Sequence, residues 1–357
     1  MDGARECEGR VGVIPGDGRV VESRASALFT QTRDYFGALV MHVPLLHAMQ
    51  EATGGSPIVY SQVPSAQVFV ALGLAQEVRT PATAGWKLLR ELRRRRFGMI
   101  VTLRPLSLGL NLTIRATGAR HTMGFSPQLG RLLLSRSWPR DRRTYRAVHY
   151  LRIFGAVDPQ SVCAASMGVL AQRAAPLEAP YGSPYCFMPC GRGRGKLWGE
   201  DHYVALARRL VERDPSARFL LVLGEREHHY PEVFASEGLA GRTRSLVEGS
   251  LADIARAVIA SRVVVANDCG PSHIAQIAGV PIVSLFGNSD GRVAERIGEW
   301  FYVRPGARCL TTAEAAPIRS IPVERVLREV EALARDPRAP GSVVFLSASE
   351  TSRCVGV

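Results

Sequence analysis

Short apolar runs alternate with amphipathic segments along most of the chain. In the first half the predicted strands are 27–32, 58–61 and 99–103, and the predicted helices are 37–52, 86–97 and 106–118. In the first of these helices Leu39, Val43 and Leu46 recur at helical spacing and share one face. Strand–helix repetition of this kind predicts a parallel, doubly wound sheet.

The alternation stops at a segment rich in proline and glycine, Ala175 to Pro184, and then restarts. The predicted strands of the second half are 185–188, 218–223, 263–267 and 282–286, and the predicted helices are 199–213, 251–260, 271–278 and 322–335. A length of 357 residues also favours two domains. We therefore predict a loose extension at 1–24, α/β domains at 25–177 and 178–335, and a polar tail at 336–357.

Arginine supplies nearly all of the positive charge. The formal net charge is +13, and the only lysines are Lys87 and Lys196. Two segments of the first half are dense in arginine, with five in 90–96 and six, against one acid, in 131–146. Such runs are commonly solvated helix faces, and the functional alternative is a field that attracts an anionic acceptor or an acidic membrane surface. No nucleic-acid-binding signature accompanies the charge.

The remaining composition favours a cytoplasmic protein with reduced thiols. No apolar run is long enough to span a bilayer, and the first residues lack the apolar stretch of a signal peptide. The seven cysteines are scattered. Cys186 and Cys190, even with His228 and His229, do not have the spacing of a zinc site, so no metal is expected.

The strongest chemical signal follows the predicted strand 263–267. Asp268 and Cys269 lead into a turn at Gly270, and the next residue is a proline suited to a first helical position. Backbone N–H groups at a helix start attract anions, and Ser272 and His273 can add side-chain donors. The alternative is a well-capped crossover in which His273 is structural.

Two weaker signals follow other predicted strands. A glycine loop after 185–188 ends in Lys196, whose ammonium can neutralise a diphosphate leaving group. The spacing of the loop glycines fits a dinucleotide-binding fingerprint poorly. After 218–223, Glu225 and Glu227 are placed to bind ribose hydroxyls, with a solvated loop as the alternative.

Together these stretches resemble the heptosyltransferase family, glycosyltransferase family nine. The resemblance rests on the interval from Pro189 to Lys196, on Asp268, Gly270 and His273 in register, and on the segments 279–281 and 285–287. It implies a GT-B fold with the acceptor domain first and the donor domain second. It also implies inverting transfer without a divalent metal or bound cofactor, from a nucleotide-diphosphate sugar such as ADP-heptose to a saccharide or glycolipid of lipopolysaccharide.

The same resemblance implies roles for individual residues. Lys196 would contact the donor phosphates, and an acid at Glu225 or Glu227 would hold the ribose. The diphosphate and sugar would be bordered by Asp268, Cys269, Gly270 and His273.

The first half departs from the family pattern at the position of the general base. Gly37 and Pro44 fit, but the expected aspartate is Ala38, which cannot accept a proton. The base is then Asp34 or His42, or the reaction needs no strong base, or the chain binds donor without turnover. Cys190 and Cys269 also replace a family glycine and a family Ser/Thr. A transferase of specialised metabolism, acting on a small molecule, is a further alternative.

Overall fold

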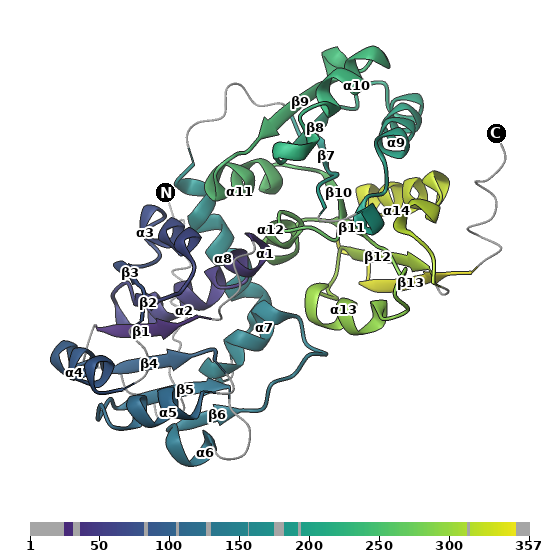
Figure 1. Cartoon of the computed structure of the whole chain (residues 1–357). Coiled ribbons are helices and arrows are strands. Elements are labelled where there is room, and N and C mark those ends of the chain that lie inside the picture. The colour runs from purple at the N-terminus through teal and green to yellow at the C-terminus, as the bar shows by residue number, and fades with distance from the viewer. Residues whose placement is uncertain are drawn as a thin grey trace, which may run out of the picture. The chain divides into compact units, whose positions relative to one another are not determined.

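The computed structural model describes residues 25–30, 36–81, 85–104, 107–125, 130–155, 157–174, 182–191, 194–312 and 315–347. The predicted extension at 1–24 and most of the proline- and glycine-rich segment lie outside these ranges. Two compact units are present, one made of residues 1–33, 44–140 and 150–158, the other of 34–43, 141–149 and 159–357. Each unit is built on its own sheet (Figure 1).

The first unit contains a six-stranded parallel sheet of order β3-β2-β1-β4-β5-β6. The strands are β1 Ser26–Phe29, β2 Ile58–Tyr60, β3 Glu77–Arg79, β4 Met99–Thr102, β5 His121–Phe125 and β6 Arg136–Trp138. The main helices of this unit are α2 Val43–Thr53, α3 Val68–Ala71, α4 Trp86–Arg95, α5 Leu108–Arg115 and α6 Gly130–Leu133. The order reverses direction between β1 and β4, as in a doubly wound sheet.

The second unit repeats the same winding in a seven-stranded parallel sheet of order β13-β12-β11-β10-β7-β8-β9. The strands are β7 Tyr185–Met188, β8 Phe219–Leu223, β9 Thr243–Val247, β10 Val263–Asn267, β11 Ile282–Phe286, β12 Ala307–Thr312 and β13 Ser342–Leu346. Central strands β7, β10 and β11 are buried along their whole length, as expected of a parallel sheet covered on both faces. The predicted α/β fold with two doubly wound sheets is confirmed.

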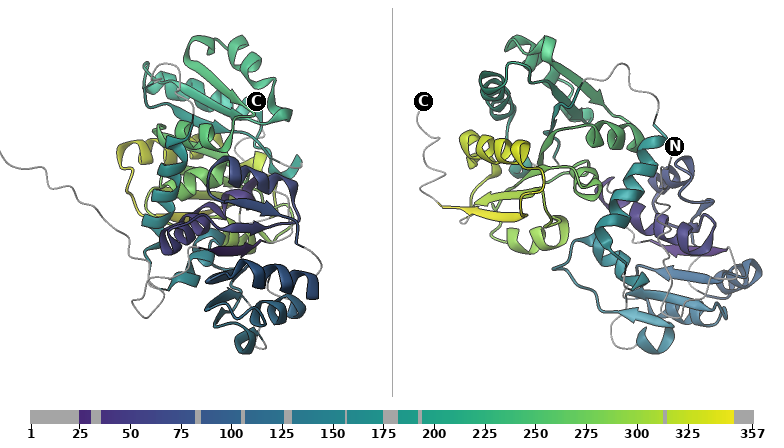
Figure 2. Two further views of the ribbon diagram at one scale, coloured as in Figure 1. Left: turned by 90° about the vertical axis from the view of Figure 1, so that its left-hand side faces the viewer. Right: turned by 180° about the vertical axis from the view of Figure 1, so that it is seen from behind.

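Helices cover both faces of the second sheet (Figures 1 and 2). One apolar core joins the strands to α9 Glu200–Arg213, α10 Tyr230–Ser236 and α14 Val323–Arg335. On the other side α11 Leu251–Ile259 and α12 Ser272–Ala278 pack against α8 Pro159–Gln172, and α13 Val293–Trp300 follows β11. This arrangement leaves the carboxyl ends of the strands as the edge at which a ligand can bind.

Three segments of the first half pack with the second sheet. They are 34–43, which contains α1 Phe36–Val40, then 141–149, which contains the start of α7 Arg146–Leu151, and α8. The domain bounds given above, 25–177 and 178–335, follow sequence order and stay a prediction.

The predicted helix 37–52 is wrong in one respect, because it is two helices. Proline has no N–H and its ring clashes with the carbonyl four residues earlier, so Pro44 ends α1 and α2 restarts at Val43. The N–H of His42 donates to the carbonyl of Leu39 at 2.9 Å, and the His42 ring donates to the carbonyl of Ala38 instead.

The predicted polar tail is also partly wrong. Residues 342–346 form β13, which pairs with β12.

Within the described ranges, no single helix has the length and apolar composition to cross a membrane. One bent pair of helices, Arg146–Phe154 with Pro159–Gln172, has the required length and apolar composition only when the two helices are counted together. In α8 the apolar side chains Val162, Met167 and Leu170 are buried.

Candidate functional site

A cavity of about 920 Å³ opens at the carboxyl edge of the second sheet. Most of its walls come from the segments that follow β10, β7, β8 and β9, which are consecutive neighbours in the sheet, and α1 and α13 supply the rest. The winding reverses between β7 and β10, so the cavity lies at the topological switch point where open α/β sheets bind ligands. All of its lining residues belong to the second unit.

Asn267 holds the ends of β7 and β10 together beneath the cavity. Its side-chain amide donates to the carbonyl of Pro189 at 2.6 Å, and its oxygen accepts the hydroxyl of Tyr203 at 3.1 Å. Asn267 is fully buried, so both bonds replace water that the side chain has lost. The two loops that carry Lys196 and Asp268 therefore start from fixed positions.

Lys196 and Asp268 form an ion pair at one end of the cavity. The Nζ of Lys196 lies 2.5 Å from Oδ2 of Asp268, and the two side chains are 42% and 12% exposed. An ammonium carries three donors, so contact with one carboxylate oxygen leaves capacity for an incoming anion. The structure thus brings together two predicted site residues that are 72 positions apart.

The turn after Asp268 packs closely against α1. A Cβ on Gly270 would lie 3.0 Å from the backbone nitrogen of Gly37 and 3.0 Å from Cδ1 of Phe36, so a side chain there would crowd α1. Cys269 and Gly270 line the cavity, but Ser272 does not. The hydroxyl of Ser272 is buried and donates to the carbonyl of Cys269 at 2.7 Å.

His273 lines the cavity although only 4% of it is exposed. Burial lowers its pKa to about 4, with Arg146 and Lys196 adding to the effect and Asp268 opposing it. The ring is therefore a neutral imidazole at physiological pH. Trp300 packs near it, with ring centroids 5.7 Å apart.

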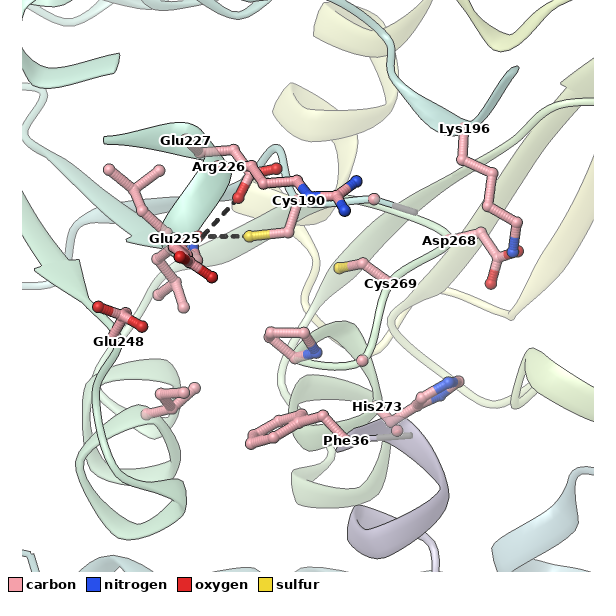
Figure 3. A pocket seen from close by; sticks show the side chains of 18 of the residues that line it. Phe36, Cys190, Lys196, Glu225, Arg226, Glu227, Glu248, Asp268, Cys269 and His273 are labelled. Carbon is pink, nitrogen blue, oxygen red and sulfur yellow. Dashed lines mark hydrogen bonds and ion pairs between the residues drawn. The ribbon is translucent and has the colours of Figure 1, made fainter. Parts of the chain in front are cut away.

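Three acids line the other end of the cavity, after β8 and β9 (Figure 3). Glu225 is exposed, whereas Glu227 is buried and its Oε2 accepts the N–H of Gly224 at 3.3 Å. Glu248, which the sequence did not single out, is held in the left-handed region with φ 48°. Beside them Cys190 donates its thiol to the carbonyl of Val222 at 3.3 Å, and burial raises its pKa to about 12.

The position of the expected base also reaches the cavity. Ala38 lines it, together with Phe36 and Gly37 of the same helix. Asp34, the predicted base, lies outside the described residues. His42 does not line the cavity: its Nδ1 donates to the carbonyl of Ala38 at 2.5 Å, and burial lowers its pKa to about 4.

Further lining residues had no recognisable sequence signal. Arg296 and Trp300 of α13 reach the cavity from a helix that the sequence did not predict. Arg146, from the arginine-rich segment, lies over the Trp300 ring at 4.1 Å and pairs with Glu299. Arg146, one of the cations of that segment, therefore packs beside the site through these two contacts.

Among the described residues, no group of three or more His, Cys, Asp or Glu side chains is arranged to hold a metal ion. The expectation that donor binding needs no metal or bound cofactor remains a prediction. The positive groups lining the cavity are Lys196, Arg226 and Arg296.

Comparison with known proteins identifies the family. The model described as glycosyltransferase family 9 (heptosyltransferase) matches residues 86–299, more than half of the 357-residue chain. No curated protein sequence matches.

Solved structures share the fold. E. coli ADP-heptose lps heptosyltransferase II is 19% identical with a TM-score of 0.59, over 88% of this chain and 100% of that one. A glycosyl transferase family 9 protein from Veillonella parvula is 15% identical with a TM-score of 0.58, over 88% and 98%. E. coli heptosyltransferase WaaC with ADP is 18% identical with a TM-score of 0.58, over 86% and 99%. The resemblance inferred from the motifs is confirmed, and the chain belongs to glycosyltransferase family 9, the heptosyltransferase family.

Proposed function

We propose that this glycosyltransferase binds a nucleotide-diphosphate sugar along the carboxyl edge of its second sheet and transfers the sugar with inversion. The order of groups along that edge is the observation that carries the proposal. Lys196 and Asp268 stand at the β10 and β7 end, and the acids Glu225 and Glu248 stand at the β8 and β9 end. A diphosphate suits the ammonium, and ribose hydroxyls suit carboxylates.

The reaction forms one bond and breaks another at the anomeric carbon. An acceptor hydroxyl oxygen attacks that carbon from the side opposite the leaving group, and the bond between the carbon and the phosphate oxygen breaks. The nucleoside diphosphate leaves with the electron pair. Lys196 offsets the charge that develops on this leaving group, so no divalent cation is required.

The proposed donor is ADP-heptose, and the acceptor is a saccharide or glycolipid. The structural neighbour WaaC has been solved with ADP and with ADP-2-deoxy-2-fluoro heptose. The test is to incubate the protein with ADP-, GDP-, UDP- and dTDP-sugars, with and without a chelator, and to measure nucleotide release and product mass. ADP-sugar turnover that survives the chelator supports the proposal, and a requirement for Mg²⁺ or Mn²⁺ contradicts it.

The proton acceptor distinguishes a working enzyme from a protein that only binds donor. Asp34 is our proposed base, because Ala38 cannot take a proton and His42 is committed to the carbonyl of Ala38. Loss of a general base costs about 10²- to 10⁴-fold in rate. Asp34→Ala should therefore slow transfer by about 10²- to 10⁴-fold while leaving ADP affinity unchanged. If wild-type protein binds ADP but transfers from none of the donors, and Ala38→Asp creates activity, the chain is a non-catalytic relative.

We also propose that the first unit contacts an acidic membrane surface through the exposed faces of α4 and α5. These two helices pack together. Trp86, Leu108 and Leu112 are 71%, 54% and 50% exposed. The exposed cations on the same helices are Lys87, Arg90, Arg93, Arg94 and Arg115. Glu91, the one acid in the two helices, pairs with Arg79 and Arg95. Exposed apolar groups among cations are suited to an anionic bilayer surface.

Vesicle sedimentation tests this surface. The protein should bind phosphatidylcholine vesicles only when phosphatidylglycerol is added. Arg90→Glu with Arg94→Glu should abolish that binding, since each basic group near the surface contributes about 1 kcal/mol. The matched control is Arg328→Glu with Arg335→Glu, two exposed arginines of α14. Equal loss in both double variants would mean that net charge, and not this surface, drives the binding.

A further inference from the structure

Gln276 lies one helical turn after His273 on the buried side of α12. It is 1% exposed, and its Oε1 accepts the backbone N–H of Tyr302 at 2.7 Å. A backbone N–H can only donate, so the side-chain oxygen must face Tyr302. The amide nitrogen of Gln276 consequently faces His273, with Nε2 of the glutamine 3.2 Å from Nδ1 of the imidazole.

A second donor reaches the same ring nitrogen. The hydroxyl of Tyr145 lies 3.3 Å from Nδ1 of His273. Burial keeps this phenol protonated, because it raises the pKa of Tyr145 well above the ordinary value. Stacking on Tyr302, with centroids 5.1 Å apart and planes inclined by 2°, holds the phenol ring in place.

Nδ1 of His273 must therefore accept. The backbone N–H of Tyr302 fixes the orientation of the Gln276 amide, so the amide hydrogens face His273. A hydrogen on Nδ1 would point directly at them. The charged groups around the ring, Arg146, Lys196 and Asp268, do not make it an imidazolium, since burial dominates. A neutral imidazole whose Nδ1 accepts carries its hydrogen on Nε2.

The Nε2 edge of the ring faces α1. A Cβ built on Gly37 would lie 2.9 Å from Cδ2 and 3.3 Å from Nε2 of His273, so Gly37 packs against this edge and a side chain at position 37 would crowd it. Gly37 lines the cavity, and so does His273, which is labelled in Figure 3.

We infer that Gln276 is a positioning residue that fixes His273 as the Nε2–H tautomer, so that His273 presents a neutral hydrogen-bond donor to an anionic oxygen in the cavity. The identity of that oxygen, on the donor diphosphate, rests on the proposed function. The opposite tautomer would present a lone pair to the phosphate and repel it. An imidazolium would place a further cation beside Lys196 and Arg146. The arrangement thus provides a donor without an added charge.

The tautomer can be measured without any ligand. Protein labelled with ¹⁵N-histidine, with the His273 signals assigned by their loss in His273→Asn, should show a protonated Nε2 and an unprotonated Nδ1 between pH 5 and pH 8. In Gln276→Glu the carboxylate only accepts, so Nδ1 should become protonated, as the other tautomer or as an imidazolium with a raised pKa. An Nδ1–H tautomer in the wild-type protein, or an unchanged ring in a folded Gln276→Glu, would overturn the inference.

Calorimetric titration with ADP supplies the functional readout. At a pH where its ring signals show the neutral Nδ1–H tautomer, Gln276→Glu should weaken ADP binding at least 10-fold, because Nε2 then carries no hydrogen to donate. Gln172→Glu, a change at an exposed glutamine of α8, should not weaken it. If Gln276→Glu does not fold, the wild-type spectrum still decides the tautomer. A changed ring with unchanged ADP affinity would leave the positioning role intact and refute the contact between His273 and the donor, which is a failure of the proposed function alone.

Discussion

Replacing Lys196 tests the donor site most directly, because the expected effects on stability and on catalysis differ in size. In the free protein the lysine is 42% exposed and pairs with Asp268 at 2.5 Å. Pairs with this much solvent contact contribute about 0–1 kcal/mol. We expect Lys196→Ala to lower the free energy of unfolding by no more than about 1 kcal/mol.

The cost in catalysis should be much larger. Removing one preorganised group that stabilises developing charge costs roughly 2–4 kcal/mol, which corresponds to about 30- to 1,000-fold in kcat/KM. Lys196→Arg should recover only part of this loss, since a planar guanidinium does not reproduce the compact charge of an ammonium.

The assay is nucleotide release from the best donor in the panel, with kcat/KM measured beside chemical denaturation of the same preparations. Asp268→Asn and the double variant complete a mutant cycle that isolates the coupling of the two side chains. Full activity and wild-type ADP affinity in Lys196→Ala would refute the assignment of the phosphates to this end of the cavity. The family relationship would then account for the fold only.

Three further predictions concern the turn, the metal and acid stability. Gly270→Ala should destabilise the protein by about 1–3 kcal/mol through overpacking against Gly37, whereas Gly168→Ala, a helical position with open space around its Cβ, should stabilise it by about 0.5–1 kcal/mol. Chemical denaturation measures both, and equal effects would contradict the packing argument. EDTA should leave ADP affinity unchanged in calorimetry, and a loss that Mg²⁺ restores would contradict metal independence. His42 has a pKa of about 4 in the folded protein against an ordinary 6.5, so its stabilising contribution is complete above pH 6.5 and falls by roughly 3 kcal/mol as the pH drops to 4. His42→Gln should flatten the dependence of unfolding free energy on pH across that window, and an unchanged slope would refute the assignment.

Much of the architecture was predictable because it rests on local patterns. Strands such as β7, β10 and β11 are continuous apolar runs, since both faces of a parallel sheet are buried. Six strands were missed because they are short, partly exposed or carry polar residues, namely β3, β5, β6, β9, β12 and β13. The chemical residues at strand ends were recognisable for a similar reason: a parallel sheet collects them at one edge.

The division of the single predicted helix 37–52 shows the limit of periodicity. Apolar spacing continues through Pro44, but hydrogen bonding at the proline does not. Sequence reasoning treated His42 as a possible base because it lies one turn beyond Ala38. The structure instead shows its ring bonded to the carbonyl that the break left without its helical partner.

Two doubly wound sheets and the side chains that follow β7, β8 and β10 could be inferred from the order of residues alone. Three features could not: that Ala38 shares a cavity with Lys196, that Tyr145 reaches His273 across 128 positions, and that Gln276 faces the ring with its amide nitrogen. The physical reason is that strands and turns follow from neighbouring residues, whereas a buried hydrogen bond is defined by partners brought together in packing. The tautomer of His273 depends on the backbone N–H of Tyr302, a group that every non-proline residue carries and that no sequence pattern distinguishes.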